Sequence, residues 1–315
     1  MASTWVVTGA CPSATAHRSP MQQNDTILVT GAAGMIGSAL VWALNRQGFQ
    51  NIILTDRLGC DERWRNLVPL RYAEYLDADQ LWDHLASPAL DVVRWVFHLG
   101  ACSATTEKNA AYLMENNFRY TRRLAEWALA GARRFVYASS AATYGNGDAG
   151  MDDGLECLDA YRPLNMYGYS KHLFDLHARR HGWFDHIVGL KYFNIFGPNE
   201  DHKGEMRSVV HKAYNQILDT GRVSLFRSHH PDFRDGEQER DFLYVKDAVA
   251  MTLHLAQAPG AAGIYNIGSG KASTWVDLVT PIFTALHLPA NIEFVDMPDV
   301  LRGKYQYHTL SLIHI

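Results

Sequence analysis

Two side chains able to move protons, Tyr167 and Lys171, stand four residues apart in the stretch NMYGYSKHLF. At that spacing on a helix they lie on the same face. A phenol with an ordinary pKa of about 10 is a weak base at neutral pH, but a nearby ammonium and an oxidised nicotinamide stabilise its phenolate. Ser140, in YASSAATYG, can hydrogen-bond the same substrate oxygen. The trio predicts that a proton leaves an alcohol while its carbon gives a hydride to a cofactor. The alternative is a tyrosine that only packs on its helix.

The stretch TILVTGAAGMIGSALVWALNRQG has the pattern of a nucleotide-binding turn. Thr26–Thr30 has the apolar character of a short buried strand, and Gly31, Gly34 and Gly37 follow at three-residue intervals before a helix-periodic segment. Asp56 ends the next strand pattern about 20 residues later, where an acid usually binds a ribose hydroxyl. The earlier WVVTGACPSATAHRSP has one glycine, two prolines and no helix pattern, so the second stretch is the predicted site.

Two arginines follow this acid. Arg57 and Arg63 are placed to meet a 2′-phosphate, which favours NADP as the cofactor. The alternative is a pair of surface arginines beside an NAD site.

Strand and helix patterns alternate along most of the chain. Strands are expected near 26–30, 51–56, 71–76, 91–99, 133–139 and 186–194, with helices at 38–48, 78–86, 107–130 and 164–181. This alternation predicts an α/β fold with a doubly wound parallel sheet, whose ligands gather at the carboxyl ends of the strands. The segments 241–256 and 263–270 are expected to return to this sheet.

The looser pattern after residue 195 predicts a second, smaller domain. We expect a dinucleotide-binding domain from residues 21–195 with about 240–270. A substrate-binding domain is expected from about 196–239 with 271–315. Residues 1–20 are expected to be a disordered or non-native leader.

Composition excludes several classes of protein. The formal net charge is −4, so there is no basic field for nucleic acid. No apolar run reaches the ~18 residues of a membrane span, and no signal-peptide pattern is present. Four scattered cysteines are typical of free thiols in a reducing cytosol, which predicts a cytoplasmic protein. His177 and His181 lack a third ligand nearby, so a solvated helix face is expected there and no metal site.

Several longer motifs carry a family resemblance. GAAGMIGS, GACSATTE, YASSAATYG, PLNMYGYSK, YFNIFGPNEDHKGEM and RDFLYVKDA together resemble the extended short-chain dehydrogenase/reductase superfamily, with its Rossmann fold, from about residue 26 to 309. Within it, GACSATTE, NEDHKGEM and LRGKYQ are most similar to the ADP-glyceromanno-heptose 6-epimerases of lipopolysaccharide-core synthesis. The resemblance implies an NADP-dependent isomerase, NAD being possible, that inverts carbon 6 of an ADP-heptose by transient oxidation. It also implies a homo-oligomer.

The resemblance implies roles for individual residues. Tyr167 matches the catalytic tyrosine, Lys171 the lysine that binds the nicotinamide ribose and Ser140 a substrate-contacting serine. The implied cofactor residues, besides Tyr167 and Lys171, are Gly31, Gly34, Met35, Ile36, Gly37, Asp56, Arg57, Arg63, Leu99, Gly100, Ala101, Cys102, Ser103 and Asn116. The implied substrate residues are Ser140, Asn194, Lys203, Glu205, Lys212, Phe226, Arg240 and Tyr305.

Lys203, in DHKGE, matches a second acid or base of these epimerases. If carbon 6 becomes a carbonyl, inversion requires hydride to return to its other face. Either the intermediate turns over or different proton donors serve its two orientations. From its sequence neighbours alone, Lys203 would be a solvated loop lysine.

Other functions share parts of this pattern. A dehydratase needs an extra acid/base carboxylate where SSAAT has Ala141 and Ala142, which argues against it. A UDP-hexose 4-epimerase and a non-catalytic NADP-binding protein stay open. The chain departs from some relatives at Glu205 and Lys212, where they carry serine and histidine. Its ending LSLIHI departs from the further strand and helices of the family, so a truncated substrate domain is expected.

Overall fold

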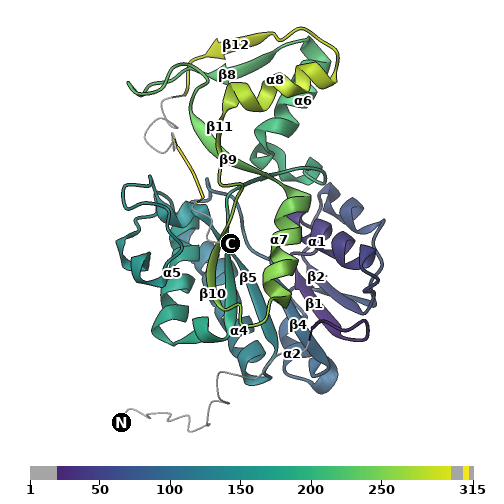
Figure 1. Cartoon of the computed structure of the whole chain (residues 1–315). Coiled ribbons are helices and arrows are strands. Elements are labelled where there is room, and N and C mark those ends of the chain that lie inside the picture. Colours follow the sequence, from purple (N-terminus) through teal and green to yellow (C-terminus); the bar gives the residue numbers. More distant parts are fainter. Residues whose placement is uncertain (1–19, 299–307, 312–315) are drawn as a thin grey trace.

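The computed structural model describes residues 20–298 and 308–311. Residues 1–19 of the expected leader, Tyr305 and most of the ending LSLIHI lie outside these ranges. The body is a seven-stranded parallel sheet in the order β10-β6-β5-β4-β1-β2-β3 (Figure 1). Its strands are β1 (Thr26–Thr30), β2 (Ile52–Asp56), β3 (Glu74–Asp77), β4 (Val93–His98), β5 (Arg134–Ser140), β6 (Ile187–Tyr192) and β10 (Gly263–Ile267). The predicted doubly wound parallel sheet is confirmed.

Alternating side chains explain why both faces of this sheet are covered. Ile27 and Val29 of β1 pack into one apolar core with helices α1 and α7, whereas Leu28 points into a second core with α2, α4 and α5. The helices of the body are α1 (Met35–Arg46), α2 (Leu81–Leu85), α3 (Ala110–Leu113), α4 (Tyr120–Ala130), α5 (Met166–Arg180) and α7 (Val245–Gln257). Because the cores fix the sheet from both sides, the carboxyl ends of its strands form a stable edge for a site.

The helix expected over 107–130 is interrupted. A π-helical turn, Met114–Arg119, separates α3 from α4. Inside it, buried Asn117 donates from Nδ2 to the Cys102 carbonyl (3.0 Å) and to Ser170 Oγ (2.9 Å). The wider turn therefore connects the loop after β4 with helix α5.

The expected return of segment 241–256 to the large sheet is only half right. Helix α7 packs on that sheet, but β9 (Glu239–Tyr244) pairs in a separate three-stranded sheet with β7 (Asn194–Phe196) and β11 (Ala272–Thr274). A strand pattern shows that a segment is extended but not which neighbours it pairs with, so the sequence could not separate the two sheets.

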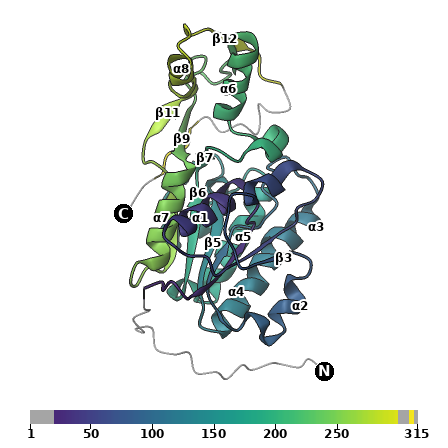
Figure 2. The same cartoon turned by 90° about the vertical axis from the view of Figure 1, so that its right-hand side faces the viewer.

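A third apolar cluster lies in a smaller region, above the large sheet in both Figure 1 and Figure 2. It is built from two separated segments: α6 (Val209–Thr220) with β8 (Val223–Phe226), and α8 (Trp275–Ala285) with β12 (Ile292–Val295). Strands β8 and β12 pair in parallel. The domain boundaries expected from the sequence stay a prediction. None of the helices that the structure describes has the length and apolar character to cross a lipid bilayer.

Candidate active site

A cavity of about 660 Å³ opens at the carboxyl ends of the strands of the large sheet. Every residue expected to hold the cofactor lines it: Gly31, Gly34, Met35, Ile36, Gly37, Asp56, Arg57, Arg63, Leu99, Gly100, Ala101, Cys102, Ser103, Asn116, Tyr167 and Lys171. Ser140 and Lys203 line it too. The fold thus brings the expected catalytic side chains and the glycine turn to one space.

The glycine turn is too tight for side chains. Gly31 has φ +67°, and a Cβ there would lie 2.6 Å from the backbone nitrogen of Gly100. A Cβ on Gly37 would lie 2.0 Å from the Gly31 carbonyl oxygen. Helix α1 begins just after Gly34, which has no side chain to cap it, so its first turn is open to an anion. Thr55 adds a buried hydroxyl that lines the cavity and has no partner among the described residues. These features fit a dinucleotide.

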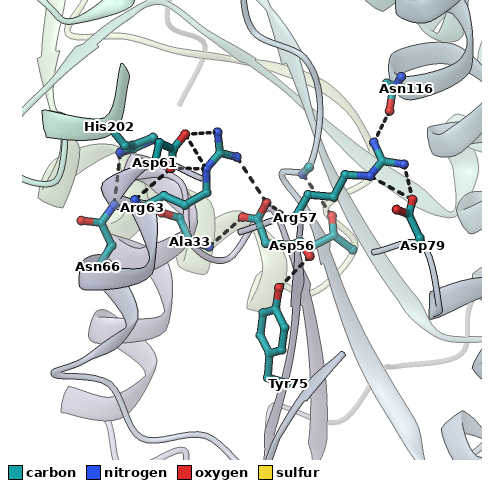
Figure 3. Close-up of polar contacts among 12 residues, drawn as sticks. Ala33, Asp56, Arg57, Asp61, Arg63, Asn66, Tyr75, Asp79, Asn116 and His202 are labelled. Carbon is teal, nitrogen blue, oxygen red and sulfur yellow. Dashed lines mark hydrogen bonds and ion pairs between the residues drawn. The ribbon is translucent and has the colours of Figure 1, made fainter. Parts of the chain in front are cut away.

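Asp56, the last residue of β2, lies beside this turn (Figure 3). Its carboxylate accepts hydrogen bonds from the backbone N–H groups of Ala33 (2.8 Å) and Arg57 (2.7 Å). Burial raises the pKa of Asp56, although these bonds and the charge of Arg63 offset part of the rise. A carboxylate fixed beside the turn is placed to accept hydrogen bonds from ribose hydroxyls.

Both candidate phosphate-binding arginines already have acidic partners (Figure 3). The Arg57 guanidinium bonds Asp79 Oδ1 and donates to Asn116 Oδ1 at 2.6 Å. Arg63 bonds Asp61 at 2.7 Å. These contacts hold both cationic groups at the rim of the cavity beside Asp56, where a 2′-phosphate would compete for them.

Tyr167, the expected catalytic tyrosine, lines the same cavity with Ser140 and Lys171. Helix α5 begins after Asn165, whose side chain accepts from Gly168 N at 2.8 Å, and this cap places Tyr167 in the first turn. Burial raises the pKa of the Tyr167 phenol, and its hydrogen bond with Ser140 offsets part of the rise. Lys171 donates from Nζ to the Ala138 carbonyl (2.8 Å), and burial lowers its pKa to about 8.

A buried polar network lies one turn further along α5. Asp175 accepts hydrogen bonds from the Tyr137 hydroxyl and Ser139 Oγ, both at 2.7 Å, and from Lys191 Nζ at 3.0 Å. The side chains of Asp175 and Lys191 are fully buried. The network joins α5 to β5 and β6. It therefore fixes the position on the sheet of the helix that carries Tyr167 and Lys171.

Lys203 enters the cavity from a different segment. It lies in a short 3-10 turn, Asp201–Met206, between the large sheet and the smaller region. Its Nζ lies 3.9 Å from Sδ of Met35, a residue of α1 that also lines the cavity. The structure therefore supplies a second amine to the space that holds Tyr167.

The other expected substrate residues that the structure describes do not line this cavity. Asn194 donates from Nδ2 to Thr309 Oγ1 (3.1 Å), and Glu205 pairs with Lys212 at 3.2 Å. Phe226 ends β8, and Arg240 is buried in β9 with its guanidinium 5.8 Å from the Trp275 ring centroid. Their role in substrate binding stays a prediction.

Sequence reasoning missed some of the lining residues. Thr55, Tyr112, Tyr120, Tyr192 and His202 also face the cavity. Of these, only His202 could have been found from the sequence, because it directly precedes Lys203 in the motif NEDHKGEM. The others belong to strands and helices whose packing patterns carry no mark of a ligand.

The histidine pair on α5 has no metal-site geometry. The rings of His177 and His181 are tilted by 33° with their centroids 4.0 Å apart, and burial lowers the pKa of His177 to about 4. Within residues 20–298 and 308–311, no group of three or more histidine, cysteine or acidic side chains is arranged to hold a metal ion.

Comparison with known proteins agrees with this geometry. Residues 27–268 match the model of the NAD dependent epimerase/dehydratase family. The chain belongs to this family.

Two relatives within the family make the likeness more specific. An ADP-L-glycero-D-manno-heptose-6-epimerase from Nitratidesulfovibrio vulgaris strain DP4 is 53% identical over 283 residues, covering 90% of this chain and 88% of that one. The crystal structure of the Helicobacter pylori ADP-L-glycero-D-manno-heptose-6-epimerase superposes with a TM-score of 0.75 at 27% identity, covering 93% of this chain and 88% of that one. The resemblance to heptose epimerases is confirmed.

Proposed function

We propose that this chain is an ADP-L-glycero-D-manno-heptose 6-epimerase, which interconverts the D-glycero and L-glycero epimers for the lipopolysaccharide core. The observation that carries the proposal is the single cavity that joins Tyr167, Ser140 and Lys171 with a second amine, Lys203. A dehydrogenase of this fold needs one proton-transfer group. A redox epimerase gains from two, because its carbonyl intermediate must be reduced on the opposite face.

In the proposed mechanism the Tyr167 phenolate takes the proton of the carbon-6 hydroxyl. Ser140, which lines the same cavity and lowers the pKa of this phenol, holds the substrate oxygen beside it. Lys171, which is mostly protonated at neutral pH because its pKa is about 8, binds the cofactor ribose and stabilises the phenolate. A bound nicotinamide supplies reversible hydride storage.

Lys203 completes the inversion. In the proposed second step its ammonium gives a proton to the carbonyl oxygen of the intermediate in its other orientation. The two groups approach from different segments, Tyr167 from α5 and Lys203 from the turn 201–206. Neither side chain then has to move across the site.

We further propose NADP as the cofactor, with NAD as the weaker ligand. Arg57 and Arg63 support this choice because both guanidinium groups line the cavity beside Asp56. We also propose that the enzyme works in the cytoplasm as a homo-oligomer.

The test is to incubate the purified protein with NADP and ADP-D-glycero-D-manno-heptose and to measure the L-glycero epimer. UDP-glucose is the control substrate, and turnover of UDP-glucose alone would refute the proposal. Tyr167→Phe is expected to bind NADP within about twofold of wild type and to lose turnover by at least about 100-fold. Unchanged turnover would remove Tyr167 from the mechanism.

A further inference from the structure

Glu200 is a buried carboxylate beside the cavity. Its side chain is fully inaccessible to solvent. It accepts hydrogen bonds from the backbone N–H of Gly197 (3.2 Å), from the backbone N–H of Ser208 (2.6 Å) and from Ser208 Oγ (2.7 Å). Burial alone would raise the pKa of Glu200, but the bonds from Ser208 and the charge of Lys203 hold it below its usual range. A buried, charged and fully bonded side chain has a fixed position.

The remaining partner of this carboxylate is Lys203. Its Nζ donates to Glu200 Oε2 at 3.2 Å, although its side chain is still 22% exposed. A loop lysine normally samples many rotamers, since its stem is flexible and its ammonium is well hydrated. Here one charge-assisted bond anchors the ammonium to a rigid group while the amine still faces the cavity.

The same carboxylate also contacts the smaller region. Ser208 is the N-cap of α6, and its Oγ accepts from His211 N at 3.2 Å. Gly197 directly follows β7. Glu200 therefore joins the end of a strand, the start of α6 and Lys203 at one point, so the position of Lys203 depends on the packing of both regions.

We propose that Glu200 is the positioning residue that holds the Lys203 ammonium at the reacting oxygen. This inference rests on the proposed role of Lys203 as the second acid or base. Glu200 acts only through Lys203, so it affects the half-reaction that uses Lys203 and leaves the half-reaction of Tyr167 unchanged.

The test follows the two half-reactions separately. Each purified epimer is mixed with excess NADP-loaded enzyme in a stopped-flow instrument, and the first-turnover rate of nicotinamide reduction is recorded by absorbance. For Glu200→Gln we expect the rate to fall about 10- to 100-fold with one epimer and to change less than about twofold with the other. Lys203→Met should slow the same epimer. A general loss of structure would slow both.

A double variant tests whether Glu200 acts through Lys203. Because a positioning residue has nothing left to position, Glu200→Gln combined with Lys203→Met should be no slower than Lys203→Met alone. The inference would be overturned if the rate losses of the two single variants multiplied in the double variant. It would also be overturned if Glu200→Gln slowed both epimers equally. If Lys203→Met itself lowered the first-turnover rate equally with both epimers, the proposed role of Lys203 would be refuted instead.

Two further variants complete the design. Asp201→Asn is the matched control, because Asp201 lies in the same turn and bonds His211 at 2.8 Å. It should leave both half-reactions within about twofold of wild type. If Glu200→Gln does not fold, Glu200→Asp keeps the charge but shortens the side chain, and it should slow the same epimer by a smaller factor. In that case, the inference would be overturned if Glu200→Asp changed the rate equally with both epimers or with neither.

Discussion

Replacing Asp175 by asparagine tests the buried network that joins helix α5 to strands β5 and β6. The carboxylate is completely buried and receives three hydrogen bonds, one of them from the fully buried Lys191. Asp175→Asn removes the carboxylate partner of the Lys191 ammonium, which keeps the Thr143 hydroxyl (Oγ1 at 2.5 Å), the new amide and the face of the Tyr144 ring (4.7 Å to its centroid). Removing one partner of a buried ion pair costs about 3–5 kcal/mol. That is a large part of the about 5–15 kcal/mol that holds a typical domain folded.

The free energy of unfolding is measured by urea denaturation with linear extrapolation, for the chain without cofactor. The matched comparison is Asp175→Asn with Lys191→Met, which removes the stranded charge and keeps an apolar stem of similar length. We expect the double variant to recover at least about 2 kcal/mol relative to Asp175→Asn. A loss below about 1 kcal/mol for Asp175→Asn, or no recovery in the double variant, would refute the reasoning.

The pH dependence gives an independent check. Burial lowers the pKa of Lys191 below its unfolded value, and Asp175 opposes this change. Without the carboxylate the folded pKa falls further, so between that value and about 10.5 the unfolded state binds the extra proton. Stability then rises with pH across this window. Wild-type stability rises in the same way only above its own folded pKa, which the carboxylate keeps higher. The difference in the free energy of unfolding between Asp175→Asn and wild type should therefore narrow with increasing pH between the two folded pKa values of Lys191, and a constant difference would contradict this origin.

Three further predictions concern the cofactor. Gly37→Ala should abolish measurable NADP binding in calorimetry and lower the melting temperature, because its Cβ would lie 2.0 Å from the Gly31 carbonyl oxygen; binding within about twofold of wild type would contradict this. NADP affinity in fluorescence titration should fall about tenfold from pH 7 to 9, because Lys171 loses its proton at about pH 8. A Lys171→Met variant, which cannot titrate, should show no such change. Arg57→Ala and Arg63→Ala should each weaken NADP about 10- to 100-fold and leave NAD within about threefold, as measured by competing titrations; equal losses for both cofactors would exclude a 2′-phosphate contact.

The sequence predicted best those features that depend on neighbours along the chain. The glycine turn, the acid that ends β2 and the i, i+4 spacing of Tyr167 and Lys171 are all local patterns, and the cavity contains each of them. The alternation of apolar runs and helices also predicted the parallel sheet, with six of its strands, and segment 263–270 was expected to return to it. Local periodicity reports these features directly, because one strand or one helix turn contains the whole signal.

The rest of the site depends on contacts between distant segments. Glu200 resembles any loop acid in the sequence, and only its burial against Gly197 and Ser208 distinguishes it. The placement of β9 was wrong for a related reason, since pairing partners are chosen by the packed structure. Asn194 illustrates the same limit, because its bond to Thr309 spans 115 positions of the chain.

One of these distant contacts joins the two ends of the site. Asn66, in the segment that carries Arg63, donates from Nδ2 to the Ala33 carbonyl (2.8 Å) and to His202 Nδ1 (3.4 Å). One amide, from the segment that also carries Arg63, is therefore bonded to both the glycine turn and the turn that carries Lys203. An epimerase that oxidises its substrate must keep the second proton donor in register with the cofactor until hydride returns, since a shift of about 1 Å can cost 100-fold in rate. Asn66 provides such a connection between the glycine turn and the turn that carries Lys203.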